Sequence, residues 1–390
     1  MTSDRAHALR LAFMICLGRV RTAHASTSLA LGSAVRGGAL AHRLTPLRSA
    51  RAITAGPVRR IVFTMLTLAL VAGVAACGSS GGGDSAGGRG PATAVLADPN
   101  PVVLSPAPHP VLPTTVHSFD GSQVTVADAG RIVAVDQYGT LAQTVWALGL
   151  GANLVGRSTS AAFPAAKDVP SVAGGSGSIN VEAVAAQRPT VFLTDTVSAT
   201  PTMRDQLKAL GITVVYFDPA RTLAGVGPQI QAVADTLGVH AQGQALVQRT
   251  QHQIDTAVAA VPKQNPAPKI AFLYLRSTAI TMMAGPGFGS HALITALGGT
   301  DAGAAITEPF IPITSESMIA ANPDVFLVMS DGLKSVGGVN GLSKVPGVAQ
   351  TTAGRDKHVV DMADTVLLGF GPDTGRIIAA LSHALYGTAA

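Results

Sequence analysis

Strand-like and helix-like segments alternate along most of the chain beyond residue 117, and this alternation limits the fold more than any other feature of the sequence. Short Gly, Pro or Asp breaks separate the segments. In the first series, strands are predicted at 123–126, 131–136, 153–157, 189–195 and 212–218, and helices at 140–149, 180–187 and 200–210. In the second series, strands are predicted at 269–276, 279–284, 324–329 and 358–362, and helices at 290–298, 315–321 and 372–386. This order predicts mainly parallel sheets with helices on their faces.

A long helical pattern over residues 223–261, with a break at Gly238 and Val239, connects the two series. We therefore predict an α/β protein of two lobes, each a mainly parallel sheet flanked by helices, joined by a single long helix. The N-terminal lobe is placed at 115–240, the linking helix at 241–262 and the C-terminal lobe at 263–390. A single linking helix is expected to resist large hinge motion between the lobes, because bending it would break its backbone hydrogen bonds. Ligand is expected in the cleft between the lobes, near the carboxyl ends of the strands.

An export signal is predicted before the folded part. Arg59 and Arg60 introduce an apolar run of 16 residues, 61–76, which is shorter than the ~20 residues of a transmembrane helix. The run ends in Val-Ala-Ala followed by Cys77, and it resembles the lipobox of bacterial lipoproteins. That resemblance implies cleavage before Cys77, a palmitate-containing lipid on Cys77, and attachment to the extracytoplasmic face of the cell membrane. Residues 1–76 are then leader and signal peptide, and the Gly-, Ser- and Pro-rich residues 77–114 are expected to be a flexible tether.

Charge and cysteine content exclude several classes of protein. The chain has 27 basic and 22 acidic residues, but its first 60 residues hold ten arginines and one acid, so the remainder carries a net charge of −4. Nucleic-acid binding needs concentrated positive charge and is not expected. Cys16 and Cys77 are the two cysteines, so the part after the signal has no internal disulfide and no cysteine metal site.

The strongest local motif is a tyrosine and an arginine two positions apart, Tyr274 and Arg276, at the end of the predicted strand 269–276. Residues two apart in a strand share a face and lie ~7 Å apart at Cα. A guanidinium stabilises a neighbouring phenolate, and a tyrosine oxygen can bind haem iron. The alternative is a tyrosine packed in the core beside an arginine that reaches solvent.

Beyond residue 117 the chain resembles the haem-binding lipoproteins of actinobacterial haem-uptake ABC transporters, which belong to the class III, helix-linked periplasmic binding proteins for haem, siderophores and cobalamin. The stretches that carry the resemblance are RIVAVDQYGTLAQTVWALGLGANLVGRSTS, INVEAVAAQRPTVFLTD, QLKALGITVVYFD, GVGPQIQAVADTLGV, KIAFLYLRSTA, ITALGGTDAG, PDVFLVMSDGLKSVGGVNGLSKVPGVAQT and VVDMADTVLLGFGP. The resemblance implies that Tyr274 is an axial ligand of the iron and that Arg276 is its partner. It also implies that haem is the transported ligand and not a catalytic cofactor, and that a monomeric chain delivers it to an ABC permease and its ATPase.

One position departs from that family. A Gly-His-x-Ile-Asn loop often supplies a second axial histidine, whereas this chain has Gly177 in that place, within the loop 174–180. The iron is then five-coordinate through Tyr274, or another residue serves, or the ligand is not haem.

Several residues are candidates for other ligand contacts, each with a structural alternative. Tyr138 follows strand 131–136 and is either a ligand or rim packing. Met282 and Met283 end strand 279–284 and either ligate iron or fill core space. His291 follows the loop 285–289 and is a reserve ligand. Arg157 ends strand 153–157 and either binds a haem propionate or lies in an exposed loop.

Glu182 and Glu316 each begin a helix, one in each lobe. Both suit a helix N-terminus electrostatically, which is the structural interpretation. In the binding-protein class such glutamates meet permease arginines, which implies a docking role.

Two other functions stay open at this point. One keeps the receptor and changes the cargo to a ferric siderophore or cobalamin, because of Gly177. The other is a surface enzyme, although the Gly-rich loop 285–289 lacks the lysine of a P-loop and no Gly-x-Ser-x-Gly follows a strand.

Overall fold

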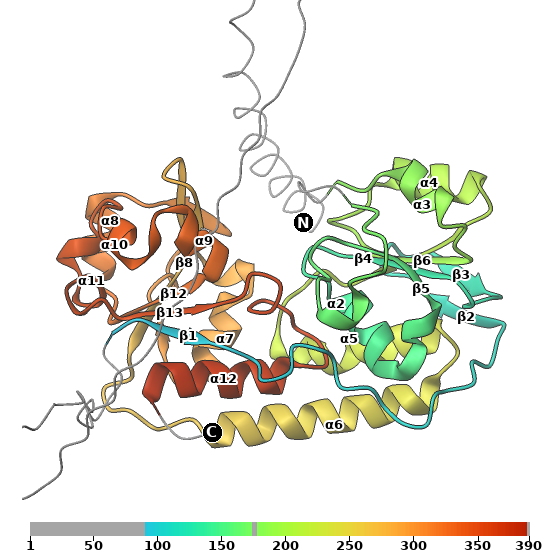
Figure 1. The fold of residues 1–390 in the computed structure, drawn as a ribbon, viewed down its shortest axis with the longest axis horizontal. Helices are drawn as coiled ribbons and strands as arrows, with labels where there is room; N and C mark the ends of the chain where they lie inside the picture. Colours follow the sequence, from blue (N-terminus) through green and yellow to red (C-terminus); the bar gives the residue numbers. More distant parts are fainter. Residues whose placement is uncertain (1–89, 174–177, 388–390) are drawn as a thin grey trace, which may run out of the picture. The chain divides into compact units, whose positions relative to one another are not determined.

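The computed structural model describes residues 90–173 and 178–387. The export signal, Cys77 and Gly177 lie outside this range. The described chain forms two α/β lobes with helices packed on parallel sheets, as the alternating pattern predicts (Figure 1). No helix among these residues combines the length and apolar character that a membrane span requires.

The N-terminal lobe is built on a four-stranded sheet in the order β5-β4-β6-β7, in which all neighbours run parallel. Its strands are β4 (Ile132–Val135), β5 (Leu154–Arg157), β6 (Val191–Asp195) and β7 (Thr213–Phe217). Every residue of β4 and β6 is buried, as expected for a parallel sheet covered on both faces. An antiparallel hairpin of β2 (Thr114–His117) and β3 (Gln123–Val126) precedes β4 in the sequence.

The C-terminal lobe contains a seven-stranded mixed sheet in the order β1-β13-β12-β8-β9-β11, with β10 paired to the start of β8. Its strands are β1 (Ala92–Ala94), β8 (Lys269–Arg276), β9 (Ile280–Ala284), β10 (Thr300–Asp301), β11 (Phe310–Pro312), β12 (Val325–Met329) and β13 (Val359–Met362). The pairs β8–β9 and β9–β11 are antiparallel, and the others are parallel. The longest strand, β8, thus lies inside the sheet and ends at the tyrosine–arginine motif.

Helices follow most strands. They are α2 (Thr140–Val145), α3 (Val181–Ala186), α4 (Pro201–Ala209), α5 (Leu223–Thr236), α6 (His240–Ala259), α7 (Ser290–Ala296), α8 (Ser315–Ala321), α9 (Ser330–Ser335), α10 (Gly338–Leu342), α11 (Thr352–Asp356) and α12 (Thr374–Tyr386). Threonine or asparagine side chains accept a backbone N–H at several helix starts, among them Asn180, Thr200, Thr222 and Thr314.

The helix α6 connects the two lobes and corresponds to the linking helix expected at 241–262. It packs against α5 of the N-terminal lobe and against α12 of the C-terminal lobe (Figure 1). One continuous cluster of buried apolar residues extends from β4 and α5 through α6 to β8 and α12. The lobes therefore share a core in addition to a covalent connection.

Residues 92–113, which we name the strap, do not form part of a flexible tether, and the prediction of flexibility over 77–114 is wrong for this segment. β1 pairs with β13 in the C-terminal lobe, and further along Leu104 and Val111 donate backbone hydrogen bonds to the N-terminal lobe. The strap is thus a second chain segment that passes between the lobes.

The strap is ordered because arginine side chains of the folded lobes donate hydrogen bonds to its backbone carbonyl oxygens. Arg376 of α12 donates to the carbonyl oxygens of Asp98 and Asn100, and Arg249 of α6 donates to that of Val102 at 2.6 Å. Composition alone predicts an unbound segment, but these arginines lie far along the chain and their contacts are not visible in the local sequence.

We expect the Arg376→Ala substitution to lower the free energy of unfolding by about 2–4 kcal/mol, because it leaves the buried Asp373 carboxylate without its hydrogen-bonded arginine partner. Arg376 pairs with Asp373 at 2.8 Å, and Asp373 is 5% exposed. Urea unfolding followed by circular dichroism measures the change. Lys334→Ala is the control, because its ion pair with Asp331 is exposed and should change stability by less than about 1 kcal/mol. Equal effects of the two substitutions would contradict the role of Arg376.

Candidate functional site

Tyr274 and Arg276 lie at the carboxyl end of β8, as the sequence predicts. The Arg276 guanidinium lies over the Tyr274 ring, with its central carbon 4.7 Å from the ring centroid. Arg276 also pairs with Asp364 through Nη2 and Oδ2 at 3.0 Å, and donates through Nη1 to the Leu275 carbonyl at 2.8 Å. Asp364, which the sequence analysis missed, therefore holds the guanidinium against the ring.

Tyr274 belongs to a cluster of aromatic side chains. Phe288 lies at the centre, with its ring centroid 4.2 Å from Phe310, 5.4 Å from Phe272 and 6.4 Å from Tyr274. Tyr138 of the N-terminal lobe is 6.3 Å from the same ring. The cluster thus joins the two lobes and supplies the apolar surface that a flat ligand would contact.

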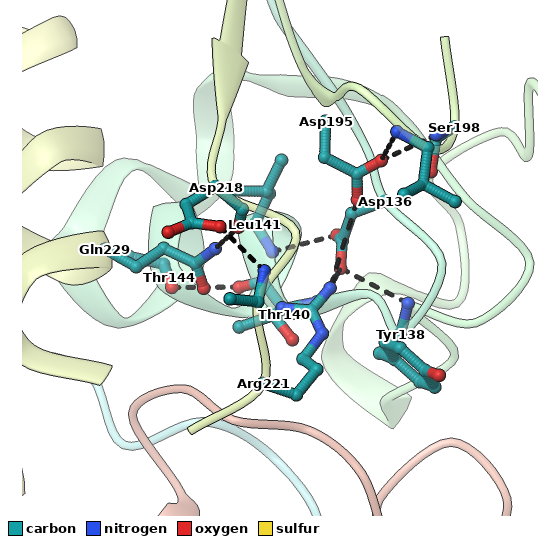
Figure 2. A network of polar contacts seen from close by, with 12 residues as sticks. Asp136, Tyr138, Thr140, Leu141, Thr144, Asp195, Ser198, Asp218, Arg221 and Gln229 are labelled. Atoms are coloured by element: carbon teal, nitrogen blue, oxygen red, sulfur yellow. Dashed lines mark hydrogen bonds and ion pairs between the residues drawn. The ribbon is translucent and has the colours of Figure 1, made fainter. Parts of the chain in front are cut away.

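Tyr138 stands next to a buried ionic network at the carboxyl ends of β4 and β6 (Figure 2). Asp136 accepts backbone hydrogen bonds from Tyr138, Thr140 and Leu141 at 3.0–3.2 Å, so its carboxylate caps the start of α2. Arg221 pairs with Asp136 at 3.4 Å, and its guanidinium carbon lies 4.8 Å from the Tyr138 ring centroid. The N-terminal lobe therefore repeats the arrangement of the C-terminal lobe, a tyrosine ring under an arginine that a carboxylate holds.

The electrostatics of Tyr138 disfavour the predicted iron contact. Burial raises the pKa of the Tyr138 phenol above its ordinary value, although the nearby Arg221 opposes the shift. A phenol must lose its proton to bind ferric iron as phenolate. The Tyr138 phenol is therefore harder to ionise than an ordinary tyrosine, which favours packing or hydrogen bonding over iron ligation.

Asp195 is the second carboxylate of the network. Its Oδ2 lies 3.9 Å from Arg221 Nη2, and its Oδ1 accepts backbone N–H groups of Val197 and Ser198. Burial, and then the neighbouring Asp136, raise the pKa of Asp195. Two carboxylates thus share one guanidinium, which leaves excess negative charge behind Tyr138.

Met282 and Met283 lie on opposite faces of the sheet, because successive residues of a strand point to opposite sides. Met283 is 4% exposed and packs in the C-terminal core opposite Leu273, so the predicted ligand role of Met283 is wrong. Met282 pairs directly with Tyr274 across the β8–β9 ladder, and such pairs share a face. The methionine on the side of the tyrosine is therefore Met282.

His291 is not directed to the tyrosine either. Its Nδ1 lies 3.0 Å from Asp301 Oδ2, and Asp301 pairs with Ile270 near the start of β8. Four residues of strand, ~13 Å, separate Ile270 from Tyr274. The reserve role of His291 as an iron ligand is therefore not supported.

Arg157 donates to backbone carbonyls of its own loop, through Nε to Ala166 at 3.0 Å and through Nη1 to Ser158 at 3.1 Å. These bonds order the loop after β5, which is the structural alternative for Arg157. Its predicted contact with a propionate stays a prediction.

Glu182 and Glu316 lie in the first turns of α3 and α8, and both are exposed. Neither has an ion-pair partner among residues 90–173 and 178–387. Both carboxylates are therefore accessible to a partner protein.

A cavity of about 860 Å³ lies elsewhere, on the N-terminal lobe between the β2 hairpin strand and the helices α5 and α6. Its lining includes neither Tyr274 nor Tyr138. The candidate site is the tyrosine–arginine pair, because a phenol and a guanidinium, groups whose chemistry suits iron and carboxylates, converge there.

The sequence analysis missed several residues of this site, among them Arg221, Phe288, Phe310 and Asp364. The loop 285–289 was recognised as a turn, and an aromatic residue within a Gly-rich turn at a strand end was the available signal for Phe288. Arg221 and Asp364 had no local signal.

The sequence and the fold match known proteins. A family model described as periplasmic binding protein matches residues 132–366. YvrC of Bacillus subtilis (strain 168), an uncharacterized ABC transporter substrate-binding lipoprotein, is 24% identical over 281 residues, which cover 71% of this chain and 86% of YvrC.

Two solved structures are more similar in sequence. The haem-binding protein HmuT is 34% identical with a TM-score of 0.73, and the match covers 77% of this chain and 98% of HmuT. The periplasmic haem-binding protein RhuT from Roseiflexus sp. RS-1 is 33% identical with a TM-score of 0.62, covering 67% of this chain and 99% of RhuT. Solved HmuT variants replace a histidine, a tyrosine, and the arginine two positions after that tyrosine.

The raised pKa of Asp195 predicts how stability depends on pH. The folded chain binds this proton at a higher pH than the unfolded chain does, so the wild-type free energy of unfolding should rise as pH falls through the folded pKa. Asp195→Asn keeps an acceptor for Val197 and Ser198 and removes the charge. We expect this variant to be more stable than wild type at pH 7, with the difference shrinking as pH falls.

Urea unfolding between pH 7 and pH 4 tests this expectation. Asp218→Asn, at an exposed carboxyl after β7, is the control. A stability difference between wild type and Asp195→Asn that stays constant over this pH range would exclude Asp195 as the titrating group.

Proposed function

This chain belongs to the periplasmic binding protein family, and from that premise we propose that it is the substrate-binding component of an ABC importer and captures haem. The family consists of binding proteins, so the chain is not an enzyme. The observation that carries the proposal is the Tyr274 ring stacked under Arg276 at the carboxyl end of β8. HmuT and RhuT, which are haem-binding proteins, support the choice of ligand.

The groups around Tyr274 match the chemistry of haem. The phenol oxygen is a ligand for ferric iron, and Phe288 and Phe310 offer aromatic surface to a flat macrocycle. Arg276 is half-exposed, so its guanidinium can reach a propionate as well as the phenolate. Haem is the transported substrate in this proposal and takes part in no reaction.

We propose five-coordinate iron, bound through Tyr274. Burial raises the pKa of the Tyr138 phenol, Met283 is in the core, and His291 pairs with Asp301. Met282, opposite Tyr274, is the remaining candidate for a contact on this face of the sheet.

A ferric siderophore or cobalamin is the second candidate cargo, and the absence of a side chain at Gly177 favours it. Titration calorimetry with ferric hydroxamates, ferric catecholates and vitamin B12 separates the candidates. Tight binding of one of these together with no binding of haemin would replace haem in the proposal.

The membrane side of the proposal has two parts. Cys77 would carry the lipid anchor, and its position next to an apolar export signal supports this, as does the lipoprotein description of YvrC. Glu182 and Glu316 would dock to basic residues of the permease, because both are exposed and each belongs to a different lobe.

We expect Tyr274→Phe to remove or shift the Soret band that forms on adding haemin, and to weaken haemin binding by at least about tenfold, because the phenol oxygen is the iron ligand. Absorbance titration measures both effects. Tyr386→Phe is the matched control, since the Tyr386 hydroxyl donates to the Leu297 carbonyl at 2.6 Å. An unchanged spectrum in Tyr274→Phe would remove Tyr274 from the iron.

We expect the double substitution Glu182→Ala and Glu316→Ala to stop haem uptake by cells while haemin affinity of the purified protein stays unchanged. Uptake should also fall with rising ionic strength in vesicles, because exposed charge pairs are screened. The control removes one exposed acid from each lobe elsewhere, Asp168→Ala with Asp356→Ala. Normal uptake by the glutamate double variant would rule out docking through these residues.

A further inference from the structure

Phe288 occupies the centre of the aromatic cluster, between the two tyrosines. It ends the short helical turn Pro286–Phe288 in the loop between β9 and α7, and it is 9% exposed. Its ring lies edge-on to both tyrosines, at 6.3 Å and 70° from Tyr138 and at 6.4 Å and 76° from Tyr274. The side chain thus stands between the phenols of the two lobes.

The loop around Phe288 has no room for a side chain at its ends, Gly285 and Gly289, but has room for one in its middle, at Gly287. A Cβ at Gly289, where φ is +100°, would lie 2.7 Å from the Cβ of Arg221, and a Cβ at Gly285 would lie 2.3 Å from the Glu308 carbonyl oxygen. Apart from its chain neighbours, no atom of the described residues lies within 4 Å of a Cβ built at Gly287. The space beside Gly287 is therefore open, and rotation of the Phe288 side chain would leave the contact between Gly289 and Arg221 in place.

The tyrosines themselves have less freedom. Arg276 lies over the Tyr274 ring and is held by Asp364, and Arg221 lies over the Tyr138 ring and is held by Asp136. Each tyrosine ring is thus backed by an arginine that is held in an ion pair, whereas the Phe288 ring has no polar partner in the described part of the chain. Of the three rings, Phe288 is the one that can yield to a ligand.

We propose that Phe288 controls access of a ligand to the Tyr274 phenol. Its ring packs edge-on against the partly exposed Tyr274 ring, and in this proposal a ligand gains full access to the phenol by displacing Phe288. The space so exposed is bounded by Phe310, Phe272 and the two tyrosine rings, which favours a planar apolar ligand over a polar siderophore. The identity of the ligand as haem rests on the proposed function, but the displacement does not.

Stopped-flow mixing of haemin with purified protein tests the displacement. Phe288→Ala and the milder Phe288→Leu should raise the association rate constant, the first by at least about fivefold, because the accessible conformation no longer has to form first. Phe163→Leu is the control, since Phe163 is also buried, with 6% of its surface exposed, and contacts Trp146 edge-on at 5.3 Å outside the site. An association rate that is unchanged or slower in both Phe288 variants, with wild-type circular dichroism, would overturn the proposal.

Nitration by tetranitromethane tests the same proposal without any haem. In protein free of added ligand, modification of Tyr274, mapped by mass spectrometry, should increase several-fold in both Phe288 variants. Tyr386, with its hydroxyl bonded to Leu297, is the internal standard. Nitration of Tyr274 that stays equal to wild type would refute displacement. If haemin fails to bind wild-type protein while nitration increases, haem is the wrong cargo and the role of Phe288 stands.

Discussion

The shared apolar core beneath the two lobes is the constraint on which the rest of the structure depends. Buried residues of β4, α5, α6, β8 and α12 belong to one cluster, so separating the lobes would expose apolar surface as well as bend a helix. Because both sheets are anchored to this core, the carboxyl ends of β4 and β8 face a common region. Tyr138 and Tyr274 consequently contact the same phenylalanine although 136 residues separate them in the chain.

The two tyrosine–arginine pairs have similar geometry and different electrostatics. Arg221 is buried between two carboxylates, and burial raises the pKa of the neighbouring Tyr138 phenol. Arg276 is half-exposed beside a single carboxylate, Asp364, and therefore keeps capacity for another anion. An arrangement that is rigid on one side and adaptable on the other suits a receptor that must hold its cargo and also release it.

The sequence predicted the elements well because alternating α/β patterns are local, and the predicted positions of β8, α6 and α12 agree with the structure within a few residues. It also placed Tyr274 and Arg276 correctly, since strand periodicity fixes their common face. What it could not predict are contacts between distant segments. Asp364 on Arg276, Arg221 on Tyr138 and Arg376 on the strap each depend on tertiary packing. Met283 was misplaced because the strand's end was recognised without knowing which face was buried.

The strap also determines where a pulling force would enter the folded protein. With Cys77 as the proposed anchor, the 13 residues to position 90 can extend by at most about 45 Å. Tension along this leash would first load the three-residue pairing of β1 with β13, at the edge of the C-terminal sheet. The arginine contacts of the strap at Asp98, Asn100 and Val102 would bear it next.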